Sequence, residues 1–288
     1  MAEFINFIVK ILYMVSNLPI IRDIVRWFAR LSRRKTDKAI IINNYTMYAN
    51  TFDRILALNL WKNSLFEDFE MKIVDEIAKE GMTVLDVGAN IGLYTLNLAD
   101  KVGISGKVYS FEPEPNNFRL LNKNIVTNSF TNVITFQKAV SNTSGHTKLF
   151  CCDENQGDHR IFDSHDARNS IDIETVALDD EMQNIGPIDL IKTDIQGAEY
   201  HAFCGMEKII KQNENLIIIC EFAPRLLEKN NTTADMLLDK IELLGFHINL
   251  VDEILMKIIP ISKEDLIKKN KGNKYCNLYL SKQPVSSN

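Results

Sequence analysis

The sequence predicts an α/β protein with a mostly parallel sheet and helices on both of its faces. From about residue 82 onward, apolar runs alternate with segments of helical periodicity, which is the pattern of strand–helix–strand units. A length of 288 residues favours one large core. The composition, 45% hydrophobic and 25% charged, excludes a wholly disordered, collagenous or polytopic membrane chain.

Seven apolar runs are predicted to be strands: 83–87, 107–111, 133–136, 189–193, 216–222, 246–251 and 275–280. Helices are predicted near residues 93–101, 116–127, 198–211 and 233–244. The last of these begins after Thr232 and ends at Gly245, in agreement with the residue preferences of helix ends. Between the third and fourth strands, the polar stretch 141–177 contains short strand-like pieces at 147–151 and 171–177. An insertion of this kind beside the mouth of a sheet commonly shapes a site.

The first 40 residues are predicted to form a basic amphipathic helical segment. Four arginines, from Arg22 to Arg33, follow one helical face, and apolar residues follow another. The uncharged run 11–21 is too short to cross a bilayer, and no cleavage site for a signal peptide follows it. Three interpretations stay open: packing on the main domain, contact of residues 20–35 with an anionic membrane surface, or self-association. Residues 41–281 are predicted to form the main domain and 282–288 a short disordered tail.

The net charge of −5 offers no overall field for nucleic acid, so a nucleic-acid partner is not expected. The five cysteines have neither the spacing of a zinc site nor that of a disulfide framework. They suit a reducing compartment, and we expect a cytoplasmic location, with peripheral membrane contact through the N-terminal segment as an extension.

The most informative motif is the glycine turn that follows the first predicted strand. Asp86 ends the strand, and Gly88 and Gly92 flank Asn90 before a helix begins. At the carboxyl end of a strand in an open α/β sheet, such a turn binds ligands. A dinucleotide site would need a glycine in place of Asn90. An acid before the turn and free N–H groups after it suit the zwitterionic end of an amino acid, as in S-adenosylmethionine.

Two later segments fit the remainder of that cofactor. Glu112 follows the second strand and is predicted to accept the ribose hydroxyls, with Pro113 beside it. Its alternative role is that of a helix-capping acid, which Glu114 could fill instead. Residues 137–140, including Ala139, follow the third strand where the adenine edge would fall.

The fourth strand brings Lys192, Asp194, Gln196 and Glu199 to the same edge of the sheet. A structural salt bridge is one explanation of these charges. Their position next to the glycine turn favours a functional one.

Six ordered blocks, VLDVGANIGLYTL, FEPEP with NNF, NV with KAVS, GDHRI, LIKTDIQGAE and ICEFAP, together resemble the FkbM family of S-adenosylmethionine-dependent methyltransferases. The resemblance covers about residues 45 to 250. It implies the Rossmann-like class I methyltransferase fold, a seven-stranded sheet with one reversed strand, and O-methylation as the usual activity. It also implies that Asp194 lies next to the transferred methyl group and that Glu67 closes over the methionine end. The residues predicted to bind the cofactor are Glu67, Asp86, Gly88, Ala89, Asn90, Gly92, Tyr94, Glu112, Pro113, Ala139 and Asp194.

A hydroxyl acceptor has to lose a proton, so a base is expected at the site. Asp194 is the first candidate, His159 in the 141–177 insertion is the second, and Glu199 is a further acid. Arg160 is a candidate for holding an anionic substrate. Asp194, Glu199 and Glu221 could instead hold a divalent cation, but no spacing is diagnostic and no metal is predicted.

The sequence therefore predicts an O-methyltransferase that acts on a sugar or another small hydroxylated acceptor. A lipid-linked acceptor is a hypothesis that rests on the N-terminal arginine face. Methylation of nucleic-acid bases is disfavoured because no Pro-Pro-aromatic platform follows Asp194. Asn90 disfavours a nicotinamide-dependent oxidoreductase. The remaining alternative is a non-catalytic cofactor-binding module that associates with a membrane or partner through its N-terminal helix.

Overall fold

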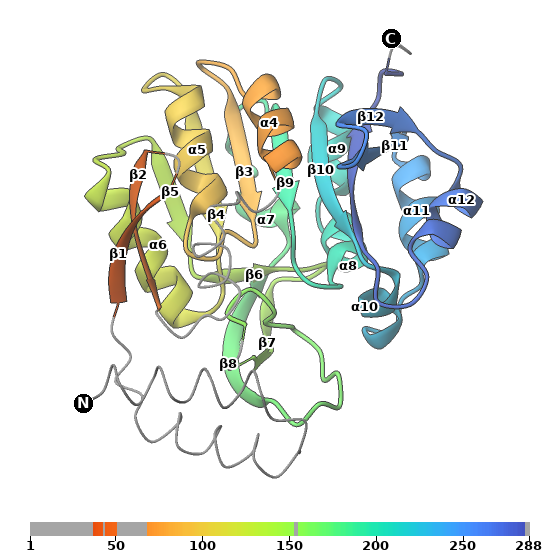
Figure 1. Cartoon of the computed structure of the whole chain (residues 1–288), viewed down its shortest axis with the longest axis horizontal. Coiled ribbons are helices and arrows are strands. Elements are labelled where there is room, and N and C mark those ends of the chain that lie inside the picture. Colours follow the sequence, from red (N-terminus) through yellow and green to blue (C-terminus); the bar gives the residue numbers. More distant parts are fainter. Residues whose placement is uncertain (1–36, 43, 51–67, 153–154, 286–288) are drawn as a thin grey trace.

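The computed structural model describes residues 37–42, 44–50, 68–152 and 155–285. The predicted amphipathic segment at 20–35 lies outside the described residues, and so does Glu67. Within the described part, the carboxyl ends of the parallel strands meet a separate three-stranded sheet (Figure 1). No helix among the described residues has the length and apolar character needed to cross a membrane.

In the described part of the chain, the main sheet has eight strands in the order β12-β11-β13-β10-β9-β3-β4-β5. Their bounds are β3 Thr83–Val87, β4 Lys107–Phe111, β5 Val133–Phe136, β9 Leu190–Thr193, β10 Ile217–Phe222, β11 His247–Asp252, β12 Lys257–Pro260 and β13 Cys276–Ser281. β13 runs antiparallel to both β10 and β11, and β12 runs antiparallel to β11. The prediction was seven strands with one of them, β13, reversed. The additional strand is β12, which forms because the chain turns back after β11 and pairs with its outer edge.

Helices cover both faces because neighbouring residues of a buried strand point to opposite sides. On one face, α4 (Asp68–Ile77) and α5 (Leu93–Val102) pack on a layer that includes Val84, Val108 and Leu190. On the other face lie α8 (Glu199–Cys204), α9 (Glu207–Gln212) and α11 (Ala234–Leu243). Most of the buried strand residues on both faces are apolar, which explains why the strands are nearly continuous hydrophobic runs in the sequence; Asp86 and Lys192 are exceptions.

One predicted helix, 198–211, is two helices. Gly205 separates α8 from α9, and a Cβ atom on Gly205 would lie 2.0 Å from the backbone oxygen of Ser141. The backbone of a distant segment therefore packs directly on Gly205. The contact breaks the helix at a place that local periodicity could not indicate.

The 141–177 insertion forms the small sheet β6-β8-β7 with Lys138–Val140, Asn169–Val176 and Gly145–Cys151. Both strand-like pieces predicted there are strands. In Figure 1 this sheet lies below the carboxyl ends of β3, β4 and β9, so the loop between β7 and β8 is placed beside that edge. The insertion thus adds a wall to the edge of the sheet where ligands bind in open α/β folds.

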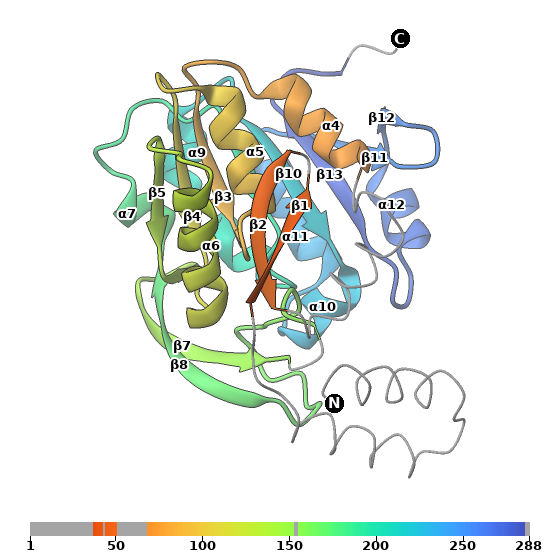
Figure 2. The same cartoon turned by 60° about the vertical axis from the view of Figure 1, so that its left-hand side comes forward.

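Several elements were not predicted: β1 (Asp37–Ile42), β2 (Tyr45–Asn50), α4, β6, β12, α7 (Leu178–Glu181), α10 (Pro224–Lys229) and α12 (Lys263–Lys269). The hairpin β1–β2 packs on α6 (Pro115–Thr127), where Asn124 accepts a hydrogen bond from the backbone of Tyr48 (Figure 2). Because β1 begins at Asp37, the last residues of the segment predicted to be helical belong to a strand. At the C-terminal end of the chain, Lys282, the first residue of the predicted tail, donates hydrogen bonds to the carbonyls of Ile210 and Asn213 and is thus held against the end of α9.

Candidate functional site

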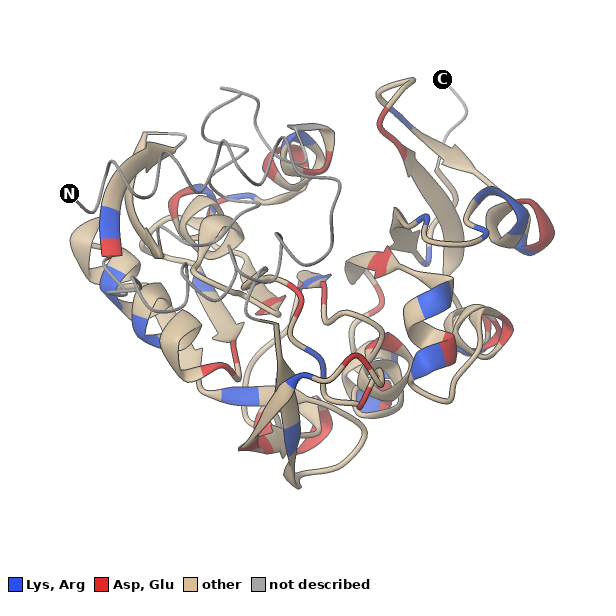
Figure 3. Cartoon of the chain, turned by 60° about the horizontal axis from the view of Figure 1, so that its bottom comes forward, with Lys and Arg blue, Asp and Glu red and all other residues tan. Residues whose placement is uncertain are grey.

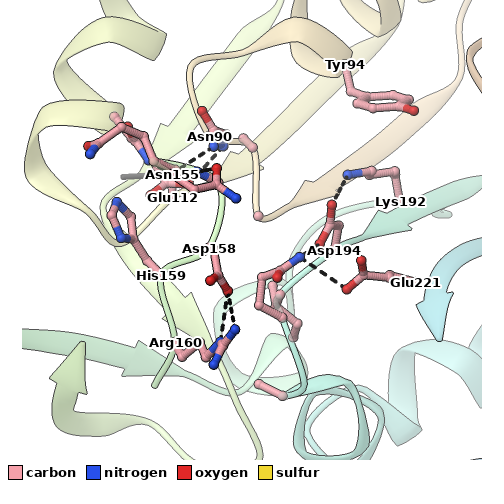
Figure 4. A pocket seen from close by; sticks show the side chains of 18 of the residues that line it. Asn90, Tyr94, Glu112, Asn155, Asp158, His159, Arg160, Lys192, Asp194 and Glu221 are labelled. Carbon is pink, nitrogen blue, oxygen red and sulfur yellow. Dashed lines mark hydrogen bonds and ion pairs between the residues drawn. The ribbon is translucent and has the colours of Figure 1, made fainter. Parts of the chain in front are cut away.

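A cleft of about 1010 Å³ opens at the carboxyl ends of β3, β4, β9 and β10. Most of the predicted site residues line it: Gly88, Ala89, Asn90, Tyr94, Glu112, Pro113, Ala139, His159 and Asp194. Their side chains form two groups, one around Asn90 and Glu112 and one around Lys192 and Asp194 (Figure 4). Asp86, Gly92 and Glu199 do not line the cleft.

The glycine turn is held tightly against the turn that follows β9. Gly88 has φ +85°, and a Cβ atom there would lie 2.0 Å from the backbone oxygen of Asp194. Only glycine fits this left-handed conformation at such a close approach. The first glycine of the motif therefore brings the two turns together and so shapes the floor of the cleft.

The backbone N–H groups of the turn are bonded inside the protein. Gly88 and Ala89 donate to the carbonyl of Phe111, and Gly92 donates to that of Ala89. Asn90 donates to Glu112 Oε2 over 2.8 Å, and the side chain of Asn90 caps the next N–H. These N–H groups are therefore used within the protein. The prediction concerned the N–H groups of the helix that follows the turn, and the first turn of that helix, α5, lies at the cleft, where Leu93 and Tyr94 line the wall.

Glu112 lies on the cleft wall, and two backbone N–H groups hold its carboxylate in place. Its Oε1 accepts the N–H of Glu114 over 2.9 Å, and its Oε2 accepts that of Asn90. Each carboxylate oxygen keeps a second lone pair for a hydroxyl. Burial raises the pKa of Glu112 to about 7, against the opposing effect of the two backbone donors. Glu114 caps α6 by accepting the N–H of Asn117, so Glu112 is not needed as a cap.

Asp86 supports the glycine turn from the interior of the protein. It is fully buried, and its Oδ2 accepts a hydrogen bond from the Thr95 hydroxyl over 2.6 Å. Burial raises its pKa, while the positive charge of Lys192 acts in the opposite direction. The prediction that Asp86 contacts the cofactor directly is corrected, because its position within the pleat of β3 turns the side chain into the interior. Gly92 is likewise removed from the cleft, since it forms the N-cap of α5.

Asp194 stands at the centre of the second group. Gln196 Nε2 donates to Asp194 Oδ1 over 2.8 Å and to Glu221 Oε2 over 3.2 Å. Lys192 Nζ lies 3.7 Å from Asp194 Oδ2 and 4.4 Å from the centre of the Tyr94 ring. An amide and an ammonium group thus hold the carboxylate of Asp194 in place while it remains on the cleft wall (Figure 4).

Glu199 was predicted to be a catalytic acid, and the structure does not place it in the cleft. It is fully buried at the start of α8, where its Oε1 accepts the N–H groups of Ile195 and Gly197. Burial raises its pKa to about 7. Glu199 therefore supports the turn after β9 and cannot join Asp194 and Glu221 around a cation. Among the described residues, no group of three or more His, Cys, Asp or Glu side chains is arranged to hold a metal ion.

His159 and Arg160 come from the loop between β7 and β8. His159 Nδ1 accepts the backbone N–H of Cys152 over 3.0 Å, so the neutral ring carries its proton on Nε2 and has no lone pair there. This tautomer does not suit a general base. Arg160 is bound by Asp158 at 2.7 Å, so its charge is compensated within the loop. Both residues line the cleft; the hydrogen bond to Nδ1 argues against His159 as the base, and the anion-binding role of Arg160 stays a prediction.

The same loop is fastened to the glycine turn. Asn90 and Asn117 both donate from their side chains to the carbonyl of Gln156, over 3.1 and 2.9 Å.

Part of the wall was not predicted from the sequence: Arg225, Lys229, Lys274 and Tyr275. Arg225 follows the block ICEFAP at the end of β10, and that position was an available signal. Lys274 and Tyr275 precede the reversed strand, and no local pattern marks them.

Comparison with known proteins identifies the family. The model of the methyltransferase FkbM domain matches residues 86–248, so the chain belongs to this family of S-adenosylmethionine-dependent methyltransferases. The fold is the class I methyltransferase fold with one added edge strand. Among curated proteins, none matches the chain.

The structure is similar to several solved methyltransferases at low identity. A putative rRNA-methylase from Clostridium thermocellum has a TM-score of 0.47 at 12% identity, over 75% of this chain and 95% of that one. An S-adenosylmethionine-dependent O-methyltransferase from Thermotoga maritima has a TM-score of 0.42 at 13% identity, over 87% and 79%. A putative methyltransferase from Streptococcus mutans, solved with S-adenosylhomocysteine, has a TM-score of 0.44 at 9% identity, over 74% and 95%.

The residues on the cleft wall fit the cofactor of this family. Glu112 would hold the ribose hydroxyls with its carboxylate oxygens, and Pro113 and Ala139, which also line the cleft, would offer an apolar surface to the adenine. Tyr94 and the start of α5 stand on the side of Asp194, where an aromatic ring and helix N–H groups suit a sulfonium and a carboxylate.

Proposed function

We propose that this methyltransferase methylates a hydroxyl group of a small polyoxygenated acceptor such as a sugar. The observation that carries the proposal is the carboxylate of Asp194, which lies on the cleft wall at the end of β9. Its side chain is 30% exposed, whereas the other acid of that turn, Glu199, is fully buried. Asp194 is thus the acid of this turn that an acceptor can reach.

S-adenosylmethionine supplies a methyl group on a sulfonium, so its leaving group needs no activation. The protein has to orient the acceptor and remove its proton. Gln196 and Lys192 each occupy one side of the Asp194 carboxylate, and the remaining lone pairs are available to a hydroxyl. Asp194 would then accept the hydroxyl proton as transfer proceeds.

A polyoxygenated acceptor is favoured by the density of polar groups beside Asp194. Gln196 and Glu221 lie next to it, and Arg225 and Lys229 line the wall beyond them. Carboxylate, amide and cationic groups close together can form hydrogen bonds with several hydroxyls at once, which a purely apolar acceptor cannot do.

The test is turnover with S-adenosylmethionine and a panel of glycans, glycolipids and phenols, measured as S-adenosylhomocysteine formed. We expect a polyhydroxylated acceptor to be methylated. Asp194→Asn should lower kcat by about 10²- to 10⁴-fold and leave S-adenosylhomocysteine binding nearly unchanged. Asp172→Asn is the matched control, because Asp172 is exposed on β8 and does not line the cleft. Turnover confined to amine, carboxylate or nucleic-acid acceptors, or a fully active Asp194→Asn variant, would contradict the proposal.

A further inference from the structure

The turn between β11 and β12 carries an exposed apolar tip, Ile254–Leu255–Met256. The exposed fractions of these three side chains are 89%, 60% and 42%. The tip is an ordered turn, because Asp252 Oδ1 accepts the N–H groups of Ile254 and Leu255, each over 3.0 Å. Scattered apolar side chains on a surface need no explanation, but three consecutive ones at the end of a hairpin form a patch.

Exposed lysines lie close to this 254–256 tip, together with the acid Glu253 that directly precedes it. Lys257 follows it directly, and Lys268, Lys271 and Lys274 lie at or just beyond the end of α12. Within the part of the chain that the structure describes, none of these four forms an ion pair with a carboxylate. The end of α12 is tied to the base of the turn, since Lys269 Nζ donates to Asp252 Oδ2 over 2.9 Å. Figure 3 shows blue basic segments on the hairpin and on the neighbouring helix, with red acidic segments beside them.

The same surface reaches the mouth of the cleft. Asn273, Lys274 and Tyr275 belong to the segment that links α12 to β13, and all three line the cleft wall. Tyr275 is 53% exposed. The lysines and the cleft entrance therefore lie on one continuous part of the molecule, next to the 254–256 tip.

We propose that the 254–256 tip and its lysines dock on an anionic lipid bilayer, with the cleft entrance next to the membrane surface. Aliphatic side chains gain free energy at the boundary between headgroups and acyl chains, and lysines gain it from anionic headgroups. The lysine stems can lie along the apolar boundary while their ammonium groups stay in water. A lipid surface matches both features of the patch, whereas nucleic acid would leave the aliphatic tip unoccupied.

The residues of this surface lie in a different part of the sequence from the N-terminal arginines, and the proposal does not depend on which acceptor is methylated. The test is flotation of the full-length protein with vesicles of phosphatidylcholine alone or mixed with phosphatidylglycerol, in the absence of cofactor and acceptor. We expect flotation with the mixed vesicles only, weakened by added salt. Replacing the tip by Ile254→Ser, Leu255→Ser and Met256→Ser should lower the partition coefficient at least about tenfold. Changing Lys257, Lys268, Lys271 and Lys274 to Gln should have a similar effect.

The matched control is the double variant Ile104→Ser, Val126→Ser, because these side chains are 84% and 76% exposed outside the patch. It should float like the parent, and all variants should keep the parent's melting temperature. No flotation of the parent with anionic vesicles would overturn the proposal. Flotation of the tip variant equal to that of the parent would overturn it as well, by assigning the binding to another part of the chain.

Discussion

The turns after β3 and β9 have the same local architecture but play different parts in the site. Each contains residues with positive φ, Asn90 in the first and Gln196 in the second, and each is supported by a fully buried acid. In the first turn, the strand's own acid, Asp86, faces the interior, and Asn90 is the polar side chain that lines the cleft. In the second turn, Asp194 itself faces the cleft and Glu199 is the buried support.

The difference follows from the place of each acid relative to the strand end. Asp86 is inside β3 and is in register with Lys192 on β9, so its side chain stays within the sheet. Asp194 comes after the last residue of β9, so its side chain leaves the pleat. Two acids at neighbouring strand ends thus look equivalent in the sequence pattern. Two residues of register separate the supporting carboxylate of Asp86 from that of Asp194, which an acceptor can reach.

The largest effect is expected where the two turns touch. Gly88→Ala places a methyl group 2.0 Å from the Asp194 oxygen at a φ of +85°, so the turns must separate. We expect a loss of at least about 4 kcal/mol in the free energy of unfolding. Gly186→Ala is the control, because a Cβ atom there meets nothing within 4 Å. Chemical unfolding of both variants measures the difference, and equal stabilities would show that the contact is not needed.

The next effect concerns the lysine between the turns. Lys192→Met leaves Asp86 buried without the attraction of the ammonium group, and this should cost about 3–5 kcal/mol in unfolding free energy. Adding Asp86→Asn removes the uncompensated charge and should restore part of the loss. Double-mutant analysis by chemical denaturation measures the coupling. Additive effects would mean that Lys192 does not link the two turns through Asp86.

The smallest effect is the pH dependence contributed by Glu199. Its pKa is about 7 in the folded protein, against an ordinary value of 4.5, so only the unfolded state releases this proton between those pH values. The stability of the parent should therefore fall as pH rises from about 4.5 to 7, by about 2–3 kcal/mol from this residue. Glu199→Gln should remove that part of the slope. Melting curves across this pH range test it, and identical slopes would contradict it.

Much of the sheet could be predicted because its strands are buried on both faces. The ranges 83–87, 107–111 and 133–136 coincide with β3, β4 and β5, since buried parallel strands are continuous apolar runs. The helix break at Gly205 could not be predicted, because it depends on the backbone of Ser141. Glu112 and Asp194 were placed correctly on the cleft by strand order. The burial of Glu199 depends on N–H groups of a turn whose conformation no local pattern shows.

The most direct test of the cofactor site is calorimetric titration of the protein with S-adenosylhomocysteine and, as a control ligand, NAD. We expect micromolar binding of S-adenosylhomocysteine only, weakened about tenfold or more by Glu112→Ala, because the ribose hydroxyls lose a charged hydrogen-bond acceptor. The Glu114→Ala variant, which loses a helix cap outside the cleft, should bind like the parent. Equal affinity of the parent and the Glu112→Ala variant, or no binding by the folded parent, would contradict the assignment of this cleft.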